Sequence, residues 1–314
     1  MRALITGIDG FAGRHLAARL RARGDVVHGV VRRADRRAAL ADCGIDAATV
    51  HVAEVTDAAA VARAVEAVKP DVCFHLAARA FVPGAAADPA AALQVNGLGT
   101  LHVLAAVQRH APGCRVIAVS SADAYGVPAA LPVTEDCPLQ PFSAYGASKA
   151  AAEVVAAQWG RSGLDVVRVR PFNHTGPGQR ADFVCPDFAR QLVAIAGGHR
   201  PPRLTVGDLT PVRDFSDVRD VVDAYIAIAE RGAAGAVYNV CSGVGRSIRS
   251  VLDDLIAAVG VAVEVVVDAD RLRVAEVPVL VGSAAALRAA TGWAPRIAWE
   301  QTLADLVADA RATA

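Results

Sequence analysis

Short apolar runs recur along the first half of the chain, and amphipathic stretches separate them. A short run rich in β-branched side chains is typical of a strand that is buried on both faces of a sheet. Helical periodicity fills the intervals between these runs. The alternation predicts an α/β fold with a doubly wound parallel sheet of the Rossmann type. The expected strands are 3–6, 26–31, 49–52, 72–76, 116–119 and 166–169, and the expected helices lie near 11–23, 57–67, 88–110 and 142–162.

The second half of the chain lacks this alternation. Residues 171–214 are rich in Gly, Pro and Arg and hold one helical stretch near 186–196. A helix near 217–230 and a strand near 236–240 are expected to return to the main sheet. We therefore expect two lobes, because 314 residues exceed one minimal domain. They are a dinucleotide-binding Rossmann domain from 1–172 and 216–245, and a smaller α/β substrate-binding lobe at the C-terminal side from 173–215 and 246–314.

Composition narrows the class of protein. The formal net charge is zero, which disfavours a nucleic-acid partner. We expect no membrane span, no secretory signal at the N-terminus, and hence a cytoplasmic enzyme. The histidines lack the spacing of a metal site, so no metal is expected. The cysteines form no CxxC pair and are expected to be reduced core residues: Cys43, Cys73, Cys114, Cys137, Cys185 and Cys241.

A glycine-rich segment follows the first expected strand and opens the first expected helix. Gly7, Gly10 and Gly13 are spaced as GxxGxxG, with Asp9 and Phe11 between them. Glycines there permit a tight turn and close approach of a pyrophosphate, and the helix N-terminus supplies free N–H donors. The alternative is a glycine-rich turn without a ligand. The strand–turn–helix context favours a dinucleotide cofactor.

The end of the second expected strand bears on the choice between NAD and NADP. An NAD enzyme usually places an acidic residue there, to bind the ribose 2′-hydroxyl. Here the acidic residue is missing, and Arg32 and Arg33 follow the strand. Arginine offers bidentate, charge-assisted hydrogen bonds to a phosphate, which favours NADP (NADPH). The alternative is an exposed basic turn in a chain that holds thirty arginines.

Tyr145 and Lys149 lie four residues apart in an expected helix, and therefore on one face of it. An ammonium beside a phenol stabilises tyrosinate and brings Tyr145 within reach of acid–base chemistry near neutral pH. Lys149 is one of only two lysines in the chain, so the pairing is unlikely to be accidental. Ser121 follows the expected strand 116–119, at the edge where catalytic groups of open α/β sheets gather.

These motifs together resemble the extended short-chain dehydrogenase/reductase family, over nearly the whole chain. The resemblance implies that Ser121, Tyr145 and Lys149 form the catalytic triad. It also implies a cofactor site and a nucleotide-sugar site. The cofactor site comprises Gly7, Asp9, Gly10, Phe11, Gly13, Arg32, Arg33, Glu54, Val55, Leu76, Ala77, Ala78, Tyr145, Lys149 and Pro171. The substrate site comprises Phe81, Val82, Ser121, Ala122, Asp123, Asn173, Phe183, Val184, Arg203 and Arg213.

Segments 170–179 and 237–243 look like those of GDP-4-keto-6-deoxy-D-mannose reductases, which form GDP-D-rhamnose. Related 4,6-dehydratases carry an acidic pair after the catalytic Ser or Thr, because eliminating water needs an extra acid and base. Here Ser121 is followed by Ala122, which transfers no protons, and then by Asp123. The sequence thus favours NADPH-dependent reduction of a 4-keto group. A nucleotide-sugar 4-epimerase, a 4,6-dehydratase and a non-catalytic NADP-binding sensor stay open as alternatives.

Two further expectations concern loops and assembly. His174 is expected to shape the sugar pocket, with a catalytic acid as the alternative. The helices around the tyrosine pair subunits in many members of the family, and Ala147 and Ala151 allow close packing there. We therefore expect a homodimer.

Overall fold

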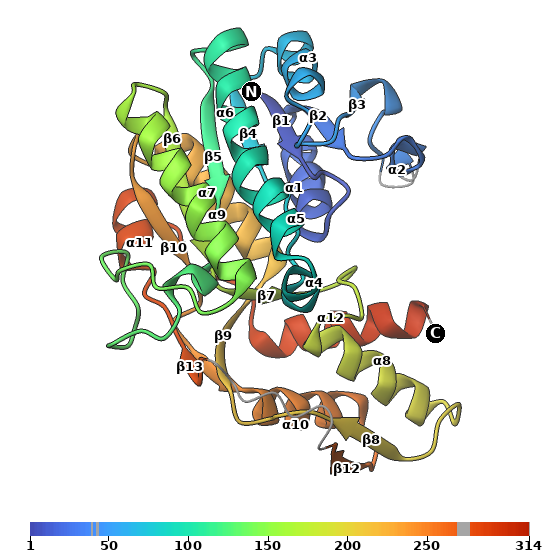
Figure 1. Cartoon of the computed structure of the whole chain (residues 1–314). Helices are drawn as coiled ribbons and strands as arrows, with labels where there is room; N and C mark the ends of the chain where they lie inside the picture. The colour runs from blue at the N-terminus through green and yellow to red at the C-terminus, as the bar shows by residue number, and fades with distance from the viewer. Residues whose placement is uncertain (39, 42–43, 269–276, 314) are drawn as a thin grey trace.

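The structure, a computed structural model, describes residues 1–38, 40–41, 44–268 and 277–313, and its centre is a parallel sheet of seven strands (Figure 1). The strand order is β10-β6-β5-β4-β1-β2-β3. The order reverses between β1 and β4, as in a doubly wound fold, and this brings the carboxyl ends of the strands to one edge. The strands are β1 (Arg2–Thr6), β2 (Val26–Val31), β3 (Val50–Val52), β4 (Val72–His75), β5 (Arg115–Val119), β6 (Val166–Pro171) and β10 (Val237–Val240).

Helices cover both faces of this sheet. Neighbouring residues of β1 point to opposite faces: Ile5 joins a core with α1 and α9, and Leu4 joins a core with α3, α6 and α7. A strand buried on both faces has no polar alternation, which explains its continuous apolar sequence. The covering helices are α1 (Phe11–Ala22), α3 (Ala58–Val68), α6 (Gly99–His110), α7 (Ala144–Arg161), α9 (Val218–Arg231) and α11 (Ala285–Thr291).

One helical stretch, Pro89–His110, is long and apolar enough by composition to cross a membrane. It consists of α5 (Pro89–Leu93), a π-helical turn (Gln94–Leu98) and α6. Half of its most apolar window is buried, and α6 packs against α3 and α7 in the core. Packing of this kind identifies a core helix of the large sheet.

A third hydrophobic core lies away from the large sheet, among the helices in the lower part of Figure 1. There α8 (Val184–Ala196), α10 (Ile248–Val259) and α12 (Trp299–Ala312) pack against one another. A small sheet pairs strands that are distant in sequence and crosses between this core and the large sheet. Its strands are β7 (Asn173–Thr175), β9 (Val212–Asp217), β11 (Gly245–Ser247) and β13 (Val279–Leu280). A further pair joins β8 (Arg203–Val206) to β12 (Glu264–Val267).

The doubly wound sheet predicted from the sequence is confirmed. The helix expected over 88–110 contains the π-helical turn, which the periodicity did not indicate. The short strands of the second half were also not foreseen individually. The two-lobe division stays a prediction; α11 falls in the range assigned to the substrate lobe but packs against α9 and β10. The described cysteines are free, and Cys43 lies outside the described residues, as do 269–276 and 314 of the predicted lobe.

Candidate active site

The glycine loop turns tightly from β1 into α1. Gly7 has a φ of 71°, which favours glycine, and its N–H donates to the Val30 carbonyl at 2.9 Å. A Cβ on Gly13 would lie 2.3 Å from the Gly7 oxygen, so no larger residue fits. The helix begins at Phe11 after Gly10, with no side-chain cap and no acidic residue in its first turn. Its N–H groups are therefore available to an anion, and this arrangement fits a pyrophosphate.

Cations surround the end of β2, beside this loop. The Arg32 and Arg33 side chains are 69% and 65% exposed. Arg33 pairs with Asp35 at 2.9 Å, and Arg32 lies 3.8 Å from Glu54. These weak surface pairs leave the guanidinium groups free to turn toward a phosphate. Asp9 of the glycine loop pairs instead with Arg36, at 3.0 Å, which the sequence did not indicate.

The segment after β4 closes the other side of the loop. A Cβ on Gly7 would lie 2.9 Å from the Cα of Ala77, so Leu76, Ala77 and Ala78 run directly beside the glycine loop. The Ala77 N–H donates to the Thr6 hydroxyl at 3.2 Å. Of the other residues predicted to bind the cofactor, Val55 is buried after β3, and Pro171 ends β6.

A buried histidine holds these strand ends together. His75 forms hydrogen bonds with Thr6 at 2.8 Å and with Thr100 at 3.0 Å. Burial lowers the pKa of His75 to about 3, so the ring stays neutral. His75 belongs to a segment, 75–78, that resembles the family, but its hydrogen bonds to Thr6 and Thr100 were not predicted from the sequence. A polar residue at the end of an apolar strand was the available signal.

Tyr145 and Lys149 are both buried in α7, beside the end of β5. The Lys149 ammonium donates to the Val119 carbonyl at 2.7 Å, and burial lowers its pKa to about 8. Ser121 caps the 3₁₀ turn Ala122–Tyr125, and its hydroxyl hydrogen-bonds the Tyr145 phenol. The structure thus brings all three predicted catalytic residues to one edge of the sheet.

The pKa of Tyr145 shifts in the direction opposite to the one expected from the sequence. Burial raises the pKa of Tyr145, and the Asp123 charge raises it further, while the Ser121 hydroxyl lowers it. The Lys149 ammonium is engaged with Val119 and contributes no opposing effect. Desolvation of the phenolate outweighs the expected help from lysine. Tyr145 is therefore protonated near neutral pH.

Asn96 fixes α7 between the tyrosine and the lysine. It lies in the π-helical turn, and its amide donates to the Ser148 hydroxyl at 2.8 Å. Its oxygen accepts the Arg79 N–H at 2.8 Å. Ser148 in turn donates to the Tyr145 carbonyl at 2.7 Å. The hydrogen bond from Asn96 to Ser148 could not be predicted from the sequence.

Behind the site lies a buried polar network. Arg170 donates to Glu153 at 3.0 Å and to the Tyr125 hydroxyl at 2.7 Å. Tyr125 donates to Asn239 at 2.7 Å, and burial raises its pKa to about 12. The network joins α7, the turn after β5, β6 and β10. Because its charges are paired, it serves to position these elements rather than to react.

The predicted substrate residues fall into two groups. Ala122 is buried in the 3₁₀ turn, Asp123 carries its carboxylate toward Ser121 and Tyr145, and Arg213 on β9 interacts with Asp123 at longer range. Asn173 begins β7, beside Phe215 of β9. These residues surround the catalytic tyrosine or lie on the strands that lead to the smaller core.

The second group lies at the starts of α4 (Val82–Ala87), α8 and β8. Phe81, which caps α4, meets Phe183 edge to face with centroids 6.0 Å apart. Phe183 and Val184 line a cavity of about 450 Å³, whereas Val82 is 39% exposed and Arg203 lies exposed at the start of β8, outside the lining. The other lining residues are Asp182, Asp187, Phe188, Thr205, Val206, Gly207, Asp208, Leu209 and Ile248.

His174 stacks on Phe11 of the glycine loop, with planes 5° apart and centroids at 6.0 Å. Its Nδ1 is 3.0 Å from the Phe172 carbonyl, so this nitrogen carries the proton and donates. Burial lowers the pKa of His174, which keeps it neutral. The contacts link β7 to α1 and favour a shaping role over that of an acid.

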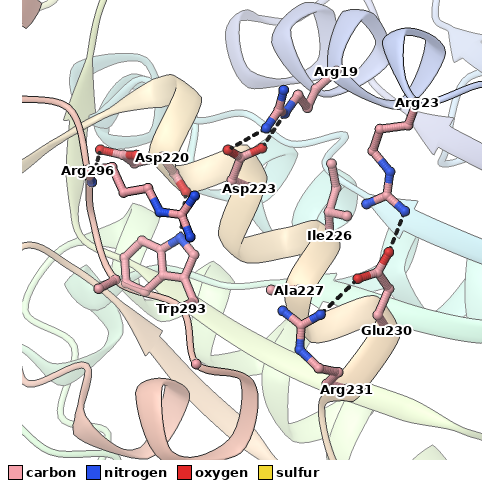
Figure 2. A pocket seen from close by; sticks show the side chains of 12 residues that line it. Arg19, Arg23, Asp220, Asp223, Ile226, Ala227, Glu230, Arg231, Trp293 and Arg296 are labelled. Carbon is pink, nitrogen blue, oxygen red and sulfur yellow. Dashed lines mark hydrogen bonds and ion pairs between the residues drawn. The ribbon is translucent and has the colours of Figure 1, made fainter.

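A second hollow, of about 190 Å³, lies between α1, α9 and the segment before α12 (Figure 2). Its charges are largely paired: Arg19 with Asp223, and Arg23 and Arg231 with Glu230. It contains none of the predicted site residues. We assign it to structure rather than to chemistry. No group of three or more His, Cys, Asp or Glu suited to a metal occurs among the described residues.

Comparison of the sequence with known proteins finds a matching family model and several similar enzymes. The model of the family described as GDP-mannose 4,6 dehydratase matches residues 4–306. GDP-6-deoxy-D-mannose reductase of Pseudomonas aeruginosa is 43% identical over 243 residues, 76% of this chain and 80% of the relative. UDP-glucose 4-epimerase of Mycolicibacterium smegmatis is 34% identical over 319 residues, 98% of this chain and 97% of the relative.

Solved structures agree. RMD from Pseudomonas aeruginosa, complexed with NADPH, superposes with a TM-score of 0.88 at 36% identity, covering 100% of both chains. UDP-glucose 4-epimerase of Thermus thermophilus, in complex with NAD, gives a TM-score of 0.85 at 29% identity, again over 100% of both chains.

Proposed function

This chain belongs to the GDP-mannose 4,6-dehydratase family of extended short-chain dehydrogenases/reductases, and we propose that it reduces the 4-keto group of a GDP-linked 4-keto-6-deoxy sugar. The substrate we favour is GDP-4-keto-6-deoxy-D-mannose, the product GDP-D-rhamnose and the reductant NADPH. The reductase relative from Pseudomonas aeruginosa and the NADPH complex of RMD support this assignment.

The residues present fit NADPH. The glycine loop leaves a cradle that a Cβ would fill, and the uncapped start of α1 offers N–H donors to a pyrophosphate. Arg32 and Arg33 lie where a 2′-phosphate requires cations, and no acidic residue follows β2 to bind a free 2′-hydroxyl. When bound, NADPH supplies the hydride for the sugar carbonyl.

The protein's own part of the reaction is to hold the carbonyl and supply a proton. Ser121 and Tyr145 present hydroxyl groups at the same point of the sheet edge. A hydrogen bond from either one polarises a carbonyl oxygen, and Tyr145 then gives its proton to the developing alkoxide. We infer that the Lys149 ammonium, charged below a pH of about 8, turns from the Val119 carbonyl toward the tyrosinate that remains and stabilises it.

The residue after Ser121 is the observation that favours reduction over dehydration. Ala122 occupies the position after Ser121, is 2% exposed and has no proton to transfer. A protonated Tyr145 beside it is suited to act as an acid, which is the role that reduction requires. A 4,6-dehydratase needs a further acid and base, and this position offers neither.

The experiment follows the hydrogen that is transferred. The protein is incubated with the GDP-linked keto sugar and NADPH deuterated at the transferable position. We expect one deuterium at C4 of a GDP-linked 6-deoxyhexose. An epimerase, such as the relative from Mycolicibacterium smegmatis, would interconvert sugars without added NADPH. Conversion without deuterium transfer would contradict the proposal, and NADPH binding without conversion would favour a sensor.

The proposal extends to assembly and location. Leu93, Leu98 and Val154 are large apolar residues, 51%, 42% and 62% exposed, on the adjacent α5, π-helical turn and α7. Apolar exposure on neighbouring helices favours a homodimer through this face. The described cysteines are free thiols, which suits the reducing cytoplasm. We propose no nucleic-acid or membrane partner.

A further inference from the structure

Asp123 occupies an unusual position beside the catalytic residues. Its Oδ2 accepts a hydrogen bond from the Ser121 hydroxyl at 3.2 Å. Its own backbone N–H donates to the same hydroxyl oxygen, also at 3.2 Å. Asp123 therefore holds the Ser121 hydroxyl with two hydrogen bonds, one from its backbone and one to its side chain. The same Ser121 hydroxyl is hydrogen-bonded to the Tyr145 phenol, so Asp123 and Tyr145 meet at one serine.

The carboxylate lacks a direct counter-ion. Arg213 of β9 acts on Asp123 only at a distance, since no ion pair joins them within the described residues. Burial raises the pKa of Asp123, while the Ser121 hydroxyl and Arg213 lower it. Asp123 is half-buried and forms no direct ion pair among the described residues. A carboxylate in this situation is energetically unfavourable, and such groups cluster at functional sites.

The other groups around the Tyr145 phenol have less influence on its protonation than Asp123 has. Lys149, on the same helix, points to the Val119 carbonyl. Tyr225 of α9 interacts electrostatically with Tyr145 but is itself neutral and buried. Ala85 of α4 and Ala92 of α5 pack against the tyrosine and carry no charge. Asp123 is therefore the charge that acts most directly on Tyr145.

We propose that Asp123 is a positioning residue which, by holding the Ser121 hydroxyl and placing a negative charge beside Tyr145, keeps the phenol protonated as the proton donor. This inference rests on the proposed reduction and adds a residue whose role that proposal leaves open. The physical reason is that a carboxylate disfavours a second negative charge nearby, so tyrosinate forms only at higher pH. Asp123 itself gives no proton to the sugar.

The test compares Asp123→Asn with the unaltered protein. Asparagine keeps the size of the side chain and an oxygen that accepts from Ser121, but it removes the charge. Reduction requires protonated Tyr145, so kcat/KM falls on the alkaline side of its pH profile. We expect Asp123→Asn to move this alkaline limb about one unit or more toward lower pH. The matched control is Asp136→Asn, an exposed carboxylate before α7, which should leave the limb in place.

A second variant separates charge from geometry. Asp123→Ala removes the charge and the acceptor, so we expect the same shift of the limb together with a lower plateau of kcat. Ultraviolet difference absorbance of tyrosinate, recorded with NADP⁺ bound, supplies a readout that needs no sugar. We expect Asp123→Asn to show a tyrosinate signal that appears at lower pH than in the unaltered protein. This signal should be absent from the double variant Asp123→Asn, Tyr145→Phe.

The outcomes are distinct. A plateau that falls while the alkaline limb and the tyrosinate titration stay in place would overturn the inference and leave Asp123 as a structural or sugar-binding residue. A shift of both measurements supports it. If the unaltered protein reduced no sugar, the proposed function would fail, but the spectral titration would still decide whether Asp123 controls Tyr145.

Discussion

Lys149 shows how a single residue can be costly for the fold and necessary for the reaction. Lys149 is 5% exposed, its ammonium donates a hydrogen bond to the Val119 carbonyl, and it lies on the helix that carries Tyr145. Burial without a carboxylate partner explains the fall of its pKa to about 8. The chain uses arginine almost everywhere else, so a retained lysine at this place is best explained by chemistry.

We predict that Lys149→Met stabilises the cofactor-free protein at pH 7 while abolishing reduction. The lowered pKa of Lys149 corresponds to about 3 kcal/mol of destabilisation of the folded protein, which the substitution removes. The substitution also removes the hydrogen bond to Val119, which costs about 1 kcal/mol. The folded-state pKa lies below the unfolded one, so the destabilisation by burial is present at neutral pH and fades between pH 8 and 10.5. Urea unfolding at pH 7 and pH 10 measures it. Equal stabilisation at both pH values would contradict the account.

The arginines after β2 yield a prediction about cofactor choice. Replacing Arg32 and Arg33 by Ala should raise the KM for NADPH by roughly 100-fold or more, because charge-assisted bonds to a 2′-phosphate are worth about 1.5–3 kcal/mol each. The KM for NADH should change little. Arg161→Ala, at the exposed end of α7, is the control and should alter neither constant. Equal losses with both cofactors would argue against recognition of the phosphate.

At the scale of elements, the strands that could be predicted from the sequence are those that are buried on both faces of the sheet. Strands of the large sheet are covered on both faces, so their sequences are continuous apolar runs that could be recognised. Strand β9 was not predicted, because Val212–Asp217 mixes charged and apolar residues and pairs with strands that are distant in sequence. The π-helical turn escaped because its apolar spacing differs little from that of an α-helix. Only the hydrogen bonds of Asn96 reveal why it is there.

The same limit applies to the candidate site. Motifs gave the identities of Ser121, Tyr145 and Lys149, and the structure gathers them. Their catalytic roles stay predictions. The sequence could not give the sign of the pKa change at Tyr145, since that depends on burial and on where the Lys149 ammonium points.

Helix α9 provides a prediction about stability. The Asp220 carboxylate accepts the N–H groups of Arg296 and Ile297, at 3.1 and 3.0 Å, and ties the segment before α12 to α9 (Figure 2). Asp220→Ala should cost about 2–4 kcal/mol of unfolding free energy, because two N–H groups lose a charged acceptor. The matched control is Asp223→Ala in the same hollow. It removes a surface pair with Arg19 and should cost less than about 1 kcal/mol.

Urea unfolding of both variants makes this comparison. The KM for NADPH should stay unchanged in each, because neither residue belongs to the predicted cofactor site. Equal losses of stability in the two variants would show that Asp220 acts only as a surface charge.

At the scale of the whole molecule, single polar and aromatic contacts connect the large sheet with the smaller core. Asp217 joins them: it caps α9, and the Thr302 hydroxyl of α12 donates to it at 2.8 Å. His174 on Phe11 connects β7 to the start of α1. These contacts explain how residues from both halves of the chain reach one sheet edge.

The exposed apolar face predicts the assembly. Val154→Asp places a charge on α7 at a side chain that is 62% exposed, and should convert a dimer into monomers of 32.3 kDa. Light scattering coupled to size exclusion measures the mass. Val244→Asp, at another exposed valine, is the control and should leave the mass unchanged. A dimer that survives Val154→Asp would place the interface elsewhere.

The most direct test of the proposed function is NADPH oxidation in the presence of GDP-4-keto-6-deoxy-D-mannose. NADH and the dTDP-linked keto sugar serve as comparisons, and Tyr145→Phe as the inactive control. The account predicts rapid oxidation of NADPH with the GDP sugar only, and a loss of about 100-fold or more in Tyr145→Phe. Absence of oxidation from a protein that binds NADPH tightly, or turnover that survives Tyr145→Phe, would contradict it.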